Sequence, residues 1–308
     1  MSKRLVQSDS RLVGRALARE GVATEEARAR VELWDSSLSP QHFLVEEEKL
    51  GDLAQIRILN NLERYGICHV RPVGISAPTR ELVETVIQMI GAATEWQNDV
   101  PGSIKDIRPT LGYSANTGNS QSDLGFHVDG TQMTLQPAVL LFQYATGATF
   151  GAHSRFADAG RILDDFSDEE RNRILTKLSR RDAATFTKGK SHFVGPIFSI
   201  SQTGALRCRI RFDGVIKVNK ACQKEFEQLK IAFDDPYYSI VFQPRDGDIV
   251  LIDNWRVTHA RTEVHGTRQR HHRRVWFANL KLEHQPKYYL GIRPLSMELA
   301  VQIKRSNA

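Results

Sequence analysis

The sequence predicts a mainly β domain with flanking helices, most simply a sandwich or jelly roll. Three observations support this fold class. Short runs of β-branched and aromatic residues recur along the chain, glycine turns separate many of them, and several helical patterns gather toward the N-terminal side. Because no linker rich in proline, glycine or serine divides the 308 residues, we expect a single domain.

The predicted helices combine apolar residues at helical spacing with residues that begin or end a helix. Residues 1–50 are polar and predict a helical N-terminal extension. Ser167, with Glu170 three positions later, forms a capping-box pattern. The other helix patterns and this one cover residues 52–65, 79–90, 168–180 and 223–233.

The predicted strands are short apolar runs between turn residues, and we expect them to pair as antiparallel neighbours. They cover residues 67–73, 124–134, 138–146, 154–159, 192–201, 205–212, 238–243, 247–255 and 273–282. A stretch rich in Ser, Asn, Gly and Thr, residues 112–123, predicts a long loop. Since long loops in compact domains often cover a site, we expect a lid there, with Tyr113 and Asn116 as substrate contacts.

Composition excludes several classes of protein. The apolar content of 41% and the charged content of 25% are ordinary for a globular chain, and the three cysteines lack the spacing of a thiolate metal site. The sequence has neither a signal peptide nor an apolar run long enough to cross a membrane, so we expect a cytoplasmic protein without a membrane partner. The net charge of +6 fits either nucleic acid or a small anionic substrate.

Two segments carry residues that can bind a metal ion. His127 and Asp129 stand two positions apart in a predicted strand, where both side chains project from one face. This pair alone is a weak signal. His259 follows a buried strand and a polar corner, and a jelly roll can bring strands that are distant in sequence to one mouth. Two histidines and one carboxylate form the ligand set of non-haem Fe(II) oxygenases.

A group of arginines follows these ligands. Arg270 and Arg274 come shortly after His259, and a guanidinium can bind a carboxylate through two parallel hydrogen bonds. The segment 270–274 is also compatible with a solvated patch or one that faces nucleic acid. Order and spacing together favour the catalytic interpretation, with a small-molecule substrate and no nucleic acid.

Four segments resemble the TauD/TfdA-like, or clavaminate-synthase-like, Fe(II)/2-oxoglutarate-dependent dioxygenases: LERYGICHVRPVG, LGFHVDGT, GDIVLIDNWRVTHAR and the Arg-x-x-x-Arg of residues 270–274. The resemblance implies a double-stranded β-helix, or jelly-roll, core. It divides the single domain 1–308 into a helical extension (1–50), a catalytic jelly roll with helices (51–285) and a C-terminal tail (286–308). The sequence does not determine the oligomeric state, and a homo-oligomer is one of the options.

The resemblance also implies roles for individual residues. His127, Asp129 and His259 are the expected iron ligands. Arg270 is the expected clamp for the distal carboxylate of 2-oxoglutarate, with Arg273 and Arg274 as alternatives. Ser154 is the expected hydroxyl contact to this co-substrate, although His153 before it departs from the family pattern, and Arg274 is the expected contact to substrate.

The expected reaction consumes O2 and 2-oxoglutarate and oxidises an unactivated C–H bond of a small anionic or zwitterionic molecule, such as an amino acid or a natural-product intermediate. Hydroxylation is the first expectation. Desaturation, cyclisation and epoxidation use the same oxidant, whereas the presence of Asp129 argues against halogenation. Two other functions remain as alternatives: a metal-free basic binding protein on the same fold, and a cupin-like metalloenzyme that does not use 2-oxoglutarate.

Overall fold

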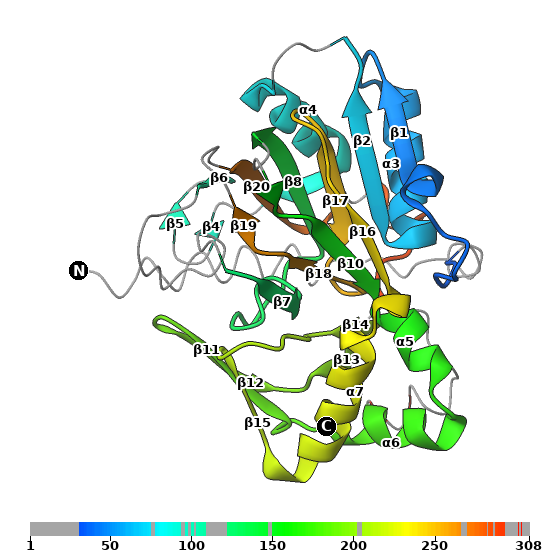
Figure 1. The fold of residues 1–308 in the computed structure, drawn as a ribbon, viewed down its shortest axis with the longest axis vertical. Coiled ribbons are helices and arrows are strands. Elements are labelled where there is room, and N and C mark those ends of the chain that lie inside the picture. The colour runs from blue at the N-terminus through cyan, green and yellow to red at the C-terminus, as the bar shows by residue number, and fades with distance from the viewer. Residues whose placement is uncertain are drawn as a thin grey trace.

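The structure is a computed structural model, and it describes the chain in segments. These are residues 31–74, 78–93, 96–97, 100–101, 103–108, 122–146, 150–201, 205–265, 270–281, 283–285, 287–292, 301 and 303. Figure 1 shows an upper part built on the largest sheet and a lower part that combines helices with smaller strands.

Within the described residues, the largest sheet has seven strands. Its order is β1 (Leu44–Glu47), β2 (Ile67–Pro72), β17 (Ile249–Asp253), β8 (Val139–Thr146), β20 (His271–Leu280) and β3 (Gly91–Ala93), with β6 (Ile104–Ile107) also paired with β20. Every pair is antiparallel except β1 with β2, which is parallel. The prediction of purely antiparallel pairing is therefore wrong at this edge.

A second sheet has four strands in the order β16 (Ser239–Phe242), β10 (Ser154–Asp158), β18 (Val257–Arg261) and β7 (Leu124–His127). One buried apolar cluster joins it to the largest sheet: Phe156 and Val257 pack with Leu140, Ile252 and Trp276. Two mainly antiparallel sheets that enclose one core form the predicted jelly roll, so the predicted fold class is confirmed.

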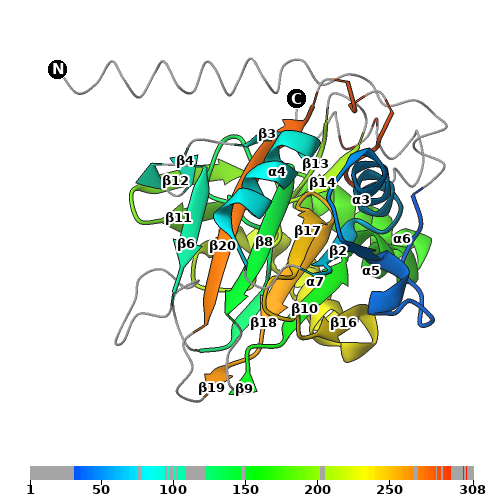
Figure 2. The same cartoon turned by 90° about the horizontal axis from the view of Figure 1, so that it is seen from above.

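Helices α3 (Asp52–Tyr65) and α4 (Arg80–Ile90) cover the other face of the largest sheet, as Figure 2 shows. Ile58 and Val86 lie in one buried cluster with Leu141 and Leu251 from the strands beneath. α3 ends where Gly66 adopts a φ of 71°, a conformation that glycine accepts at little cost. The two helices therefore give the sheet an apolar cover.

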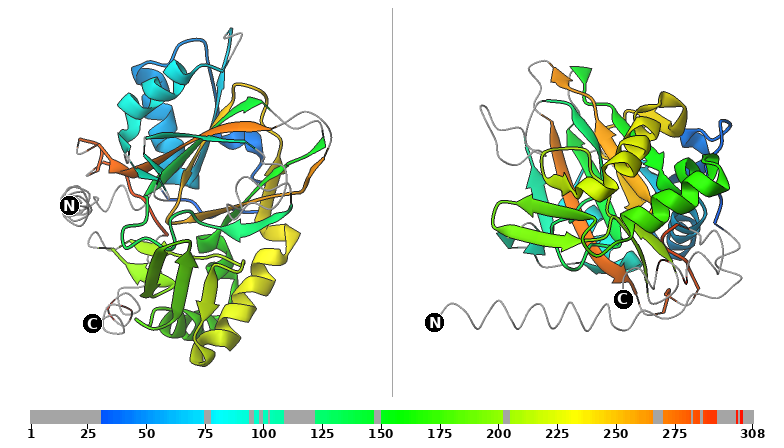
Figure 3. Two further views of the ribbon diagram at one scale, coloured as in Figure 1. Left: turned by 90° about the vertical axis from the view of Figure 1, so that its left-hand side faces the viewer. Right: turned by 90° about the horizontal axis from the view of Figure 1, so that it is seen from below.

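The lower part comes from residues 159–238, between β10 and β16, and Figures 1 and 3 show it below the jelly roll. Its helices are α5 (Ala159–Asp165), α6 (Asp168–Leu178) and α7 (Gln223–Asp234). Its strands are β11 (Ala184–Lys188), β12 (Ser191–Gly195), β13 (Phe198–Ile200), β14 (Leu206–Cys208) and β15 (Ile216–Val218). The remaining short elements are η1 (Pro40–Phe43), β4 (Trp96–Gln97), β5 (Val100–Pro101), β9 (Phe150–Gly151), η3 (Lys220–Cys222), η4 (Pro236–Tyr238) and β19 (Val264–His265).

The four predicted helices beyond residue 50 are present, and Ser167 accepts a hydrogen bond from the Glu170 N–H as the capping pattern predicts. Helix α5 was not predicted: Asp158 ends β10 and caps the helix through the Gly160 N–H. The prediction of a helical extension is wrong at β1, which is a strand of the largest sheet, whereas η1 before it is a short 3-10 helix. Residues 1–30, the first part of this extension, lie outside the described residues.

Candidate metal centre and its pocket

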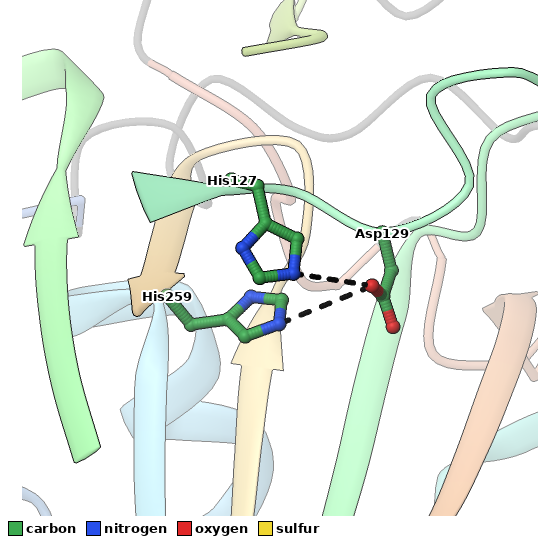
Figure 4. A group of neighbouring side chains, drawn as sticks. All are labelled: His127, Asp129 and His259. Atoms are coloured by element: carbon green, nitrogen blue, oxygen red, sulfur yellow. Dashed lines mark ion pairs between the residues drawn. The ribbon is translucent and has the colours of Figure 1, made fainter. Parts of the chain in front are cut away.

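Strand pairing brings the two candidate histidine ligands together. His127, the last residue of β7, is the register partner of His259 in β18, and their ring centroids are 4.2 Å apart. Asp129 follows two residues later in a turn, so the expectation that it lies on the strand is wrong. Its Oδ1 nevertheless lies 3.7 Å from His127 Nε2 and 4.0 Å from His259 Nε2 (Figure 4). The ligand atoms of the three residues all lie within 4.8 Å of one another.

The protonation of the two imidazoles suits a metal ion. His127 Nδ1 lies 2.9 Å from the carbonyl oxygen of Gly125, an acceptor that holds the proton on Nδ1 and leaves Nε2 as a lone pair. Burial lowers the pKa of His259 to about 4, and burial together with the adjacent His259 and Arg211 holds the pKa of His127 well below its usual value. Two neutral imidazoles and a carboxylate thus direct lone pairs to one point, an arrangement that fits Fe(II).

The carboxylate of Asp129 is ionised and fixed in orientation. Its Oδ2 accepts hydrogen bonds from Arg274 Nη1 at 2.7 Å and from Trp276 Nε1 at 2.8 Å. Burial alone raises the pKa of Asp129, but the charge of Arg274, the two neighbouring histidines and the hydrogen bond from Trp276 outweigh it and bring the pKa far below the ordinary value. Because Oδ2 is occupied, Oδ1 is the oxygen directed toward the imidazoles.

A buried asparagine holds the backbone at Asp129. Asn254 Oδ1 accepts the Asp129 N–H at 2.8 Å, and Asn254 Nδ2 donates to the carbonyl oxygens of Asp129 at 3.0 Å and Pro137 at 2.8 Å. Asn254 belongs to the corner between β17 and β18, and β18 carries His259. Gly130 allows the turn with a φ of 71°, where a Cβ atom would lie 2.5 Å from Pro137 Cδ. One corner of the chain therefore positions ligands from both segments.

The three candidate ligands line a pocket that also contains Ser154, Arg270 and Arg274. Ser154 Oγ lies 2.7 Å from the hydroxyl oxygen of Tyr144. Arg270 is 5% exposed, and burial together with the charge of Arg261 lowers its pKa to about 9. At this end of the pocket, a serine hydroxyl and a buried guanidinium can both donate hydrogen bonds to a bound carboxylate.

The other predicted contacts have different surroundings. Arg273, an alternative clamp, donates to the carbonyl oxygen of Pro78 and to Gln143 Oε1 and does not line the pocket. Arg274 lines the pocket but already binds Asp129. Tyr113 and Asn116, the predicted lid contacts, lie outside the described residues.

Several pocket residues were not predicted as site residues. Tyr144 and His272 face one another in β8 and β20, with ring centroids 4.3 Å apart. His272 stands two positions from both Arg270 and Arg274. Because every second residue of a strand points to the same face, the sequence could have predicted His272 as a pocket residue. Lys188 comes from the β11–β12 hairpin, for which the sequence gives no comparable signal.

A jelly roll with a largely buried His-Asp-His set beside arginines defines the class of non-haem iron oxygenases. The chain matches the model of the family described as taurine catabolism dioxygenase TauD, TfdA family, over residues 37–276. It therefore belongs to this family and is an oxidoreductase that uses iron and 2-oxoglutarate. The match begins at residue 37, within the segment predicted as an extension.

Solved structures with the same fold include three oxygenases of low sequence identity. Asparagine oxygenase (AsnO) has a TM-score of 0.61 at 16% identity, over 79% of this chain and 85% of its own. The non-heme iron oxygenase OrfP, in complex with Fe and alpha-ketoglutaric acid, has a TM-score of 0.60 at 16% identity, over 79% and 86%. PvcB from Pseudomonas aeruginosa has a TM-score of 0.59 at 17% identity, over 78% and 87%.

No curated protein matches the sequence. Within the described part of the chain, none of the helices has the length and apolar character needed to span a membrane.

Proposed function

We propose that the protein hydroxylates an unactivated C–H bond of a small anionic or zwitterionic substrate, such as an amino acid or a natural-product intermediate. Fe(II) is held by His127, Asp129 and His259, and 2-oxoglutarate by Arg270 and Ser154. The convergence of the three ligand atoms within 4.8 Å, in one pocket with a buried guanidinium, carries this proposal. Two similar structures support an amino-acid substrate: an asparagine oxygenase is in complex with 2S,3S-3-hydroxyasparagine, and a mutant of OrfP is in complex with (3S)-hydroxy-L-Arg.

When bound, iron would supply, with O2 and 2-oxoglutarate, an oxidant strong enough to attack a C–H bond, and the co-substrate would be converted to succinate and CO2. The residues of the chain supply orientation and charge. Arg270 offers a planar pair of N–H donors to the distal carboxylate of 2-oxoglutarate, and Ser154 offers its hydroxyl. Tyr144 fixes the Ser154 hydroxyl by a hydrogen bond of 2.7 Å.

The pocket walls contribute a dry, shaped environment. Phe142 lies 5.2 Å from the His259 ring, centroid to centroid, and Phe156 and Ile107 also line the pocket. These apolar walls exclude water from the metal centre and strengthen the electrostatic contacts within it. Arg274 keeps Asp129 ionised, and because a guanidinium has five N–H groups, it remains the proposed substrate contact. Tyr113 and Asn116 remain predicted contacts from the loop.

An anaerobic titration of Fe(II) and 2-oxoglutarate tests the proposal. We expect the visible charge-transfer band of an Fe(II)·2-oxoglutarate complex in the wild-type protein, no band in His127→Ala, and a large loss of 2-oxoglutarate affinity in Arg270→Gln. Arg273→Gln is the matched control, since Arg273 lies outside the pocket and should leave the band unchanged. Absence of the band from the wild type, or an unchanged affinity in Arg270→Gln, contradicts the proposal.

The type of oxidation is decided by product analysis. A panel of L-amino acids is incubated with the aerobic enzyme, and succinate is measured with and without each compound. A product that has gained one oxygen atom supports hydroxylation or epoxidation, which isotope-resolved NMR separates, whereas loss of two hydrogens indicates desaturation or ring closure. Succinate formation that none of the amino acids stimulates excludes this substrate class.

A further inference from the structure

The pocket has two separate groups of charged residues. At one end Ser154 is the register partner of Arg261, its hydroxyl lies 2.7 Å from that of Tyr144, and the charge of Arg261 acts on Arg270. At the other end Arg211 is the bridge partner of His127 and Arg274 binds Asp129, and the charges of both arginines act on Lys188. The first end is the one proposed above for 2-oxoglutarate, so the second end is available to the substrate.

Lys188 is held in place by the hairpin that carries it. It ends β11, which pairs on one side with β12 and on the other with β15. Phe186, two residues earlier, is fully buried, and the guanidinium of Arg209 stacks 4.1 Å from the ring centre of Phe193 in β12. The backbone of Lys188 therefore has a fixed position, and the side chain reaches the metal pocket from the lower part of the molecule.

The charges around Lys188 are unbalanced. Arg211 forms two hydrogen bonds with the carboxylate of Asp213, at 2.7 and 2.5 Å, and Arg274 pairs with Asp129. Among the described residues, no acidic side chain forms an ion pair with Lys188. Two arginines that already have acidic partners thus stand beside a lysine that has none, which leaves this end with excess positive charge.

A second lysine adds to this charge. Lys105 in β6 is the register partner of Arg274 in β20, so both side chains project from the same face of the sheet. Burial and the charge of Arg274 lower the pKa of Lys105, and burial and the charge of Arg211 lower the pKa of Lys188 to about 8. Both ammonium groups are therefore held at an electrostatic cost that an incoming anion would relieve.

We propose that Lys188, supported by Lys105, binds an anionic group at one end of the substrate: a carboxylate, sulfonate or phosphate whose neighbouring carbon chain extends over the metal centre. This inference rests on the proposed function, because it assigns the Arg270 end of the same pocket to 2-oxoglutarate. The substrate consequently carries a negative charge of its own, and neutral molecules of the same shape bind more weakly.

The test uses methanesulfonate as an anionic probe and methanesulfonamide as its neutral counterpart. Each is titrated calorimetrically, without oxygen, into protein saturated with Fe(II) and 2-oxoglutarate. We expect the wild type to bind the sulfonate more tightly than the sulfonamide, and Lys188→Met to bind the sulfonate roughly tenfold more weakly. Lys188→Arg should retain most of the affinity. Acetate and methyl phosphate, titrated in the same way, show which anion the site prefers.

Lys190→Met is the matched control, because Lys190 is exposed and lies in the turn of the same hairpin. It should leave sulfonate binding unchanged. Equal sulfonate affinities in the wild type and Lys188→Met, or no preference of the wild type for the anion, overturn the inference. The charge-transfer band separates the two proposals: a normal band without Lys188-dependent binding rejects only this subsite, whereas an absent band rejects the proposed function.

Discussion

The indole of Trp276 should determine how tightly the protein holds iron, although it is not itself a ligand. Its Nε1 donates to Asp129 Oδ2 at 2.8 Å, one of two hydrogen bonds that direct Oδ1 toward the histidines. Trp276→Phe removes this donor and keeps an aromatic ring at the same place. Arg274 then remains as the second donor to Oδ2.

The size of the effect follows from the charge on the acceptor. A hydrogen bond to an ionised group contributes about 1.5–3 kcal/mol, which corresponds to roughly 10- to 100-fold in a binding constant. Loss of an outer partner of a metal ligand weakens metal binding by a similar factor, about 10- to 100-fold. We therefore expect the Kd for Fe(II) to rise within this range, measured by anaerobic calorimetry.

Lost packing has to be separated from lost orientation. Trp276 is 1% exposed, so the smaller ring also lowers the free energy of unfolding by about 1–3 kcal/mol. Trp34→Phe is the control: Trp34 is 4% exposed, and its Nε1 donates to the carbonyl oxygen of Tyr65, away from the ligands. It should lose stability and keep iron affinity. Unchanged iron affinity in Trp276→Phe, or an equal loss in Trp34→Phe, refutes the reasoning.

Three further predictions concern the co-substrate, the metal turn and a buried acid. Arg270→Lys should raise the Kd for 2-oxoglutarate by about 10- to 100-fold and leave Fe(II) binding intact, because an ammonium cannot form two parallel hydrogen bonds; equal affinity in the charge-transfer titration contradicts this. Gly130→Ala should lower the free energy of unfolding by about 1–3 kcal/mol, because its Cβ would lie 2.5 Å from Pro137 Cδ at a φ of 71°; an unchanged denaturant midpoint argues against it. Burial raises the pKa of Asp253 to about 6, above the value of about 3.9 in an unfolded chain, so the folded state binds more protons between these values. This acid therefore costs stability as the pH rises from about 4 to about 6, by up to about 3 kcal/mol. Asp253→Asn should lack this component, and stability curves that stay parallel between pH 4 and pH 7 count against the shift.

The sequence predicted the metal cluster because its signals are local. His127 and Asp129 are two residues apart, and His259 follows a strand whose apolar residues are easily recognised. The family resemblance predicted Arg270 as the clamp and left Arg273 and Arg274 as alternatives; in the structure Arg270 and Arg274 line the pocket, whereas Arg273 donates to the carbonyl oxygen of Pro78. The residues themselves are local signals, but their convergence depends on the pairing of β7 with β18.

Contacts between distant segments could not be predicted in the same way. Asn254 accepts a hydrogen bond from the Asp129 N–H although the two residues are 125 positions apart in the sequence. This hydrogen bond holds the turn that follows β7. Lys188 reaches the pocket only after residues 159–238 fold against the jelly roll. Helix α5 escaped prediction because its first residue continues the apolar strand pattern of β10, so Asp158 could be assigned to a strand as readily as to a cap.

The hydrogen bonds that Asn254 forms with Asp129 and Pro137 bear on the order in which the protein folds and binds iron. Asn254 follows the lower part in the sequence, whereas its partners Asp129 and Pro137 precede it, so these hydrogen bonds form only when β7 and β18 have paired. Such a long-range pairing has to overcome a large loss of chain entropy before it contributes stability. Iron capture should therefore complete folding rather than initiate it: metal added at the start of refolding should leave the early folding rate unchanged and slow only the unfolding of the finished protein.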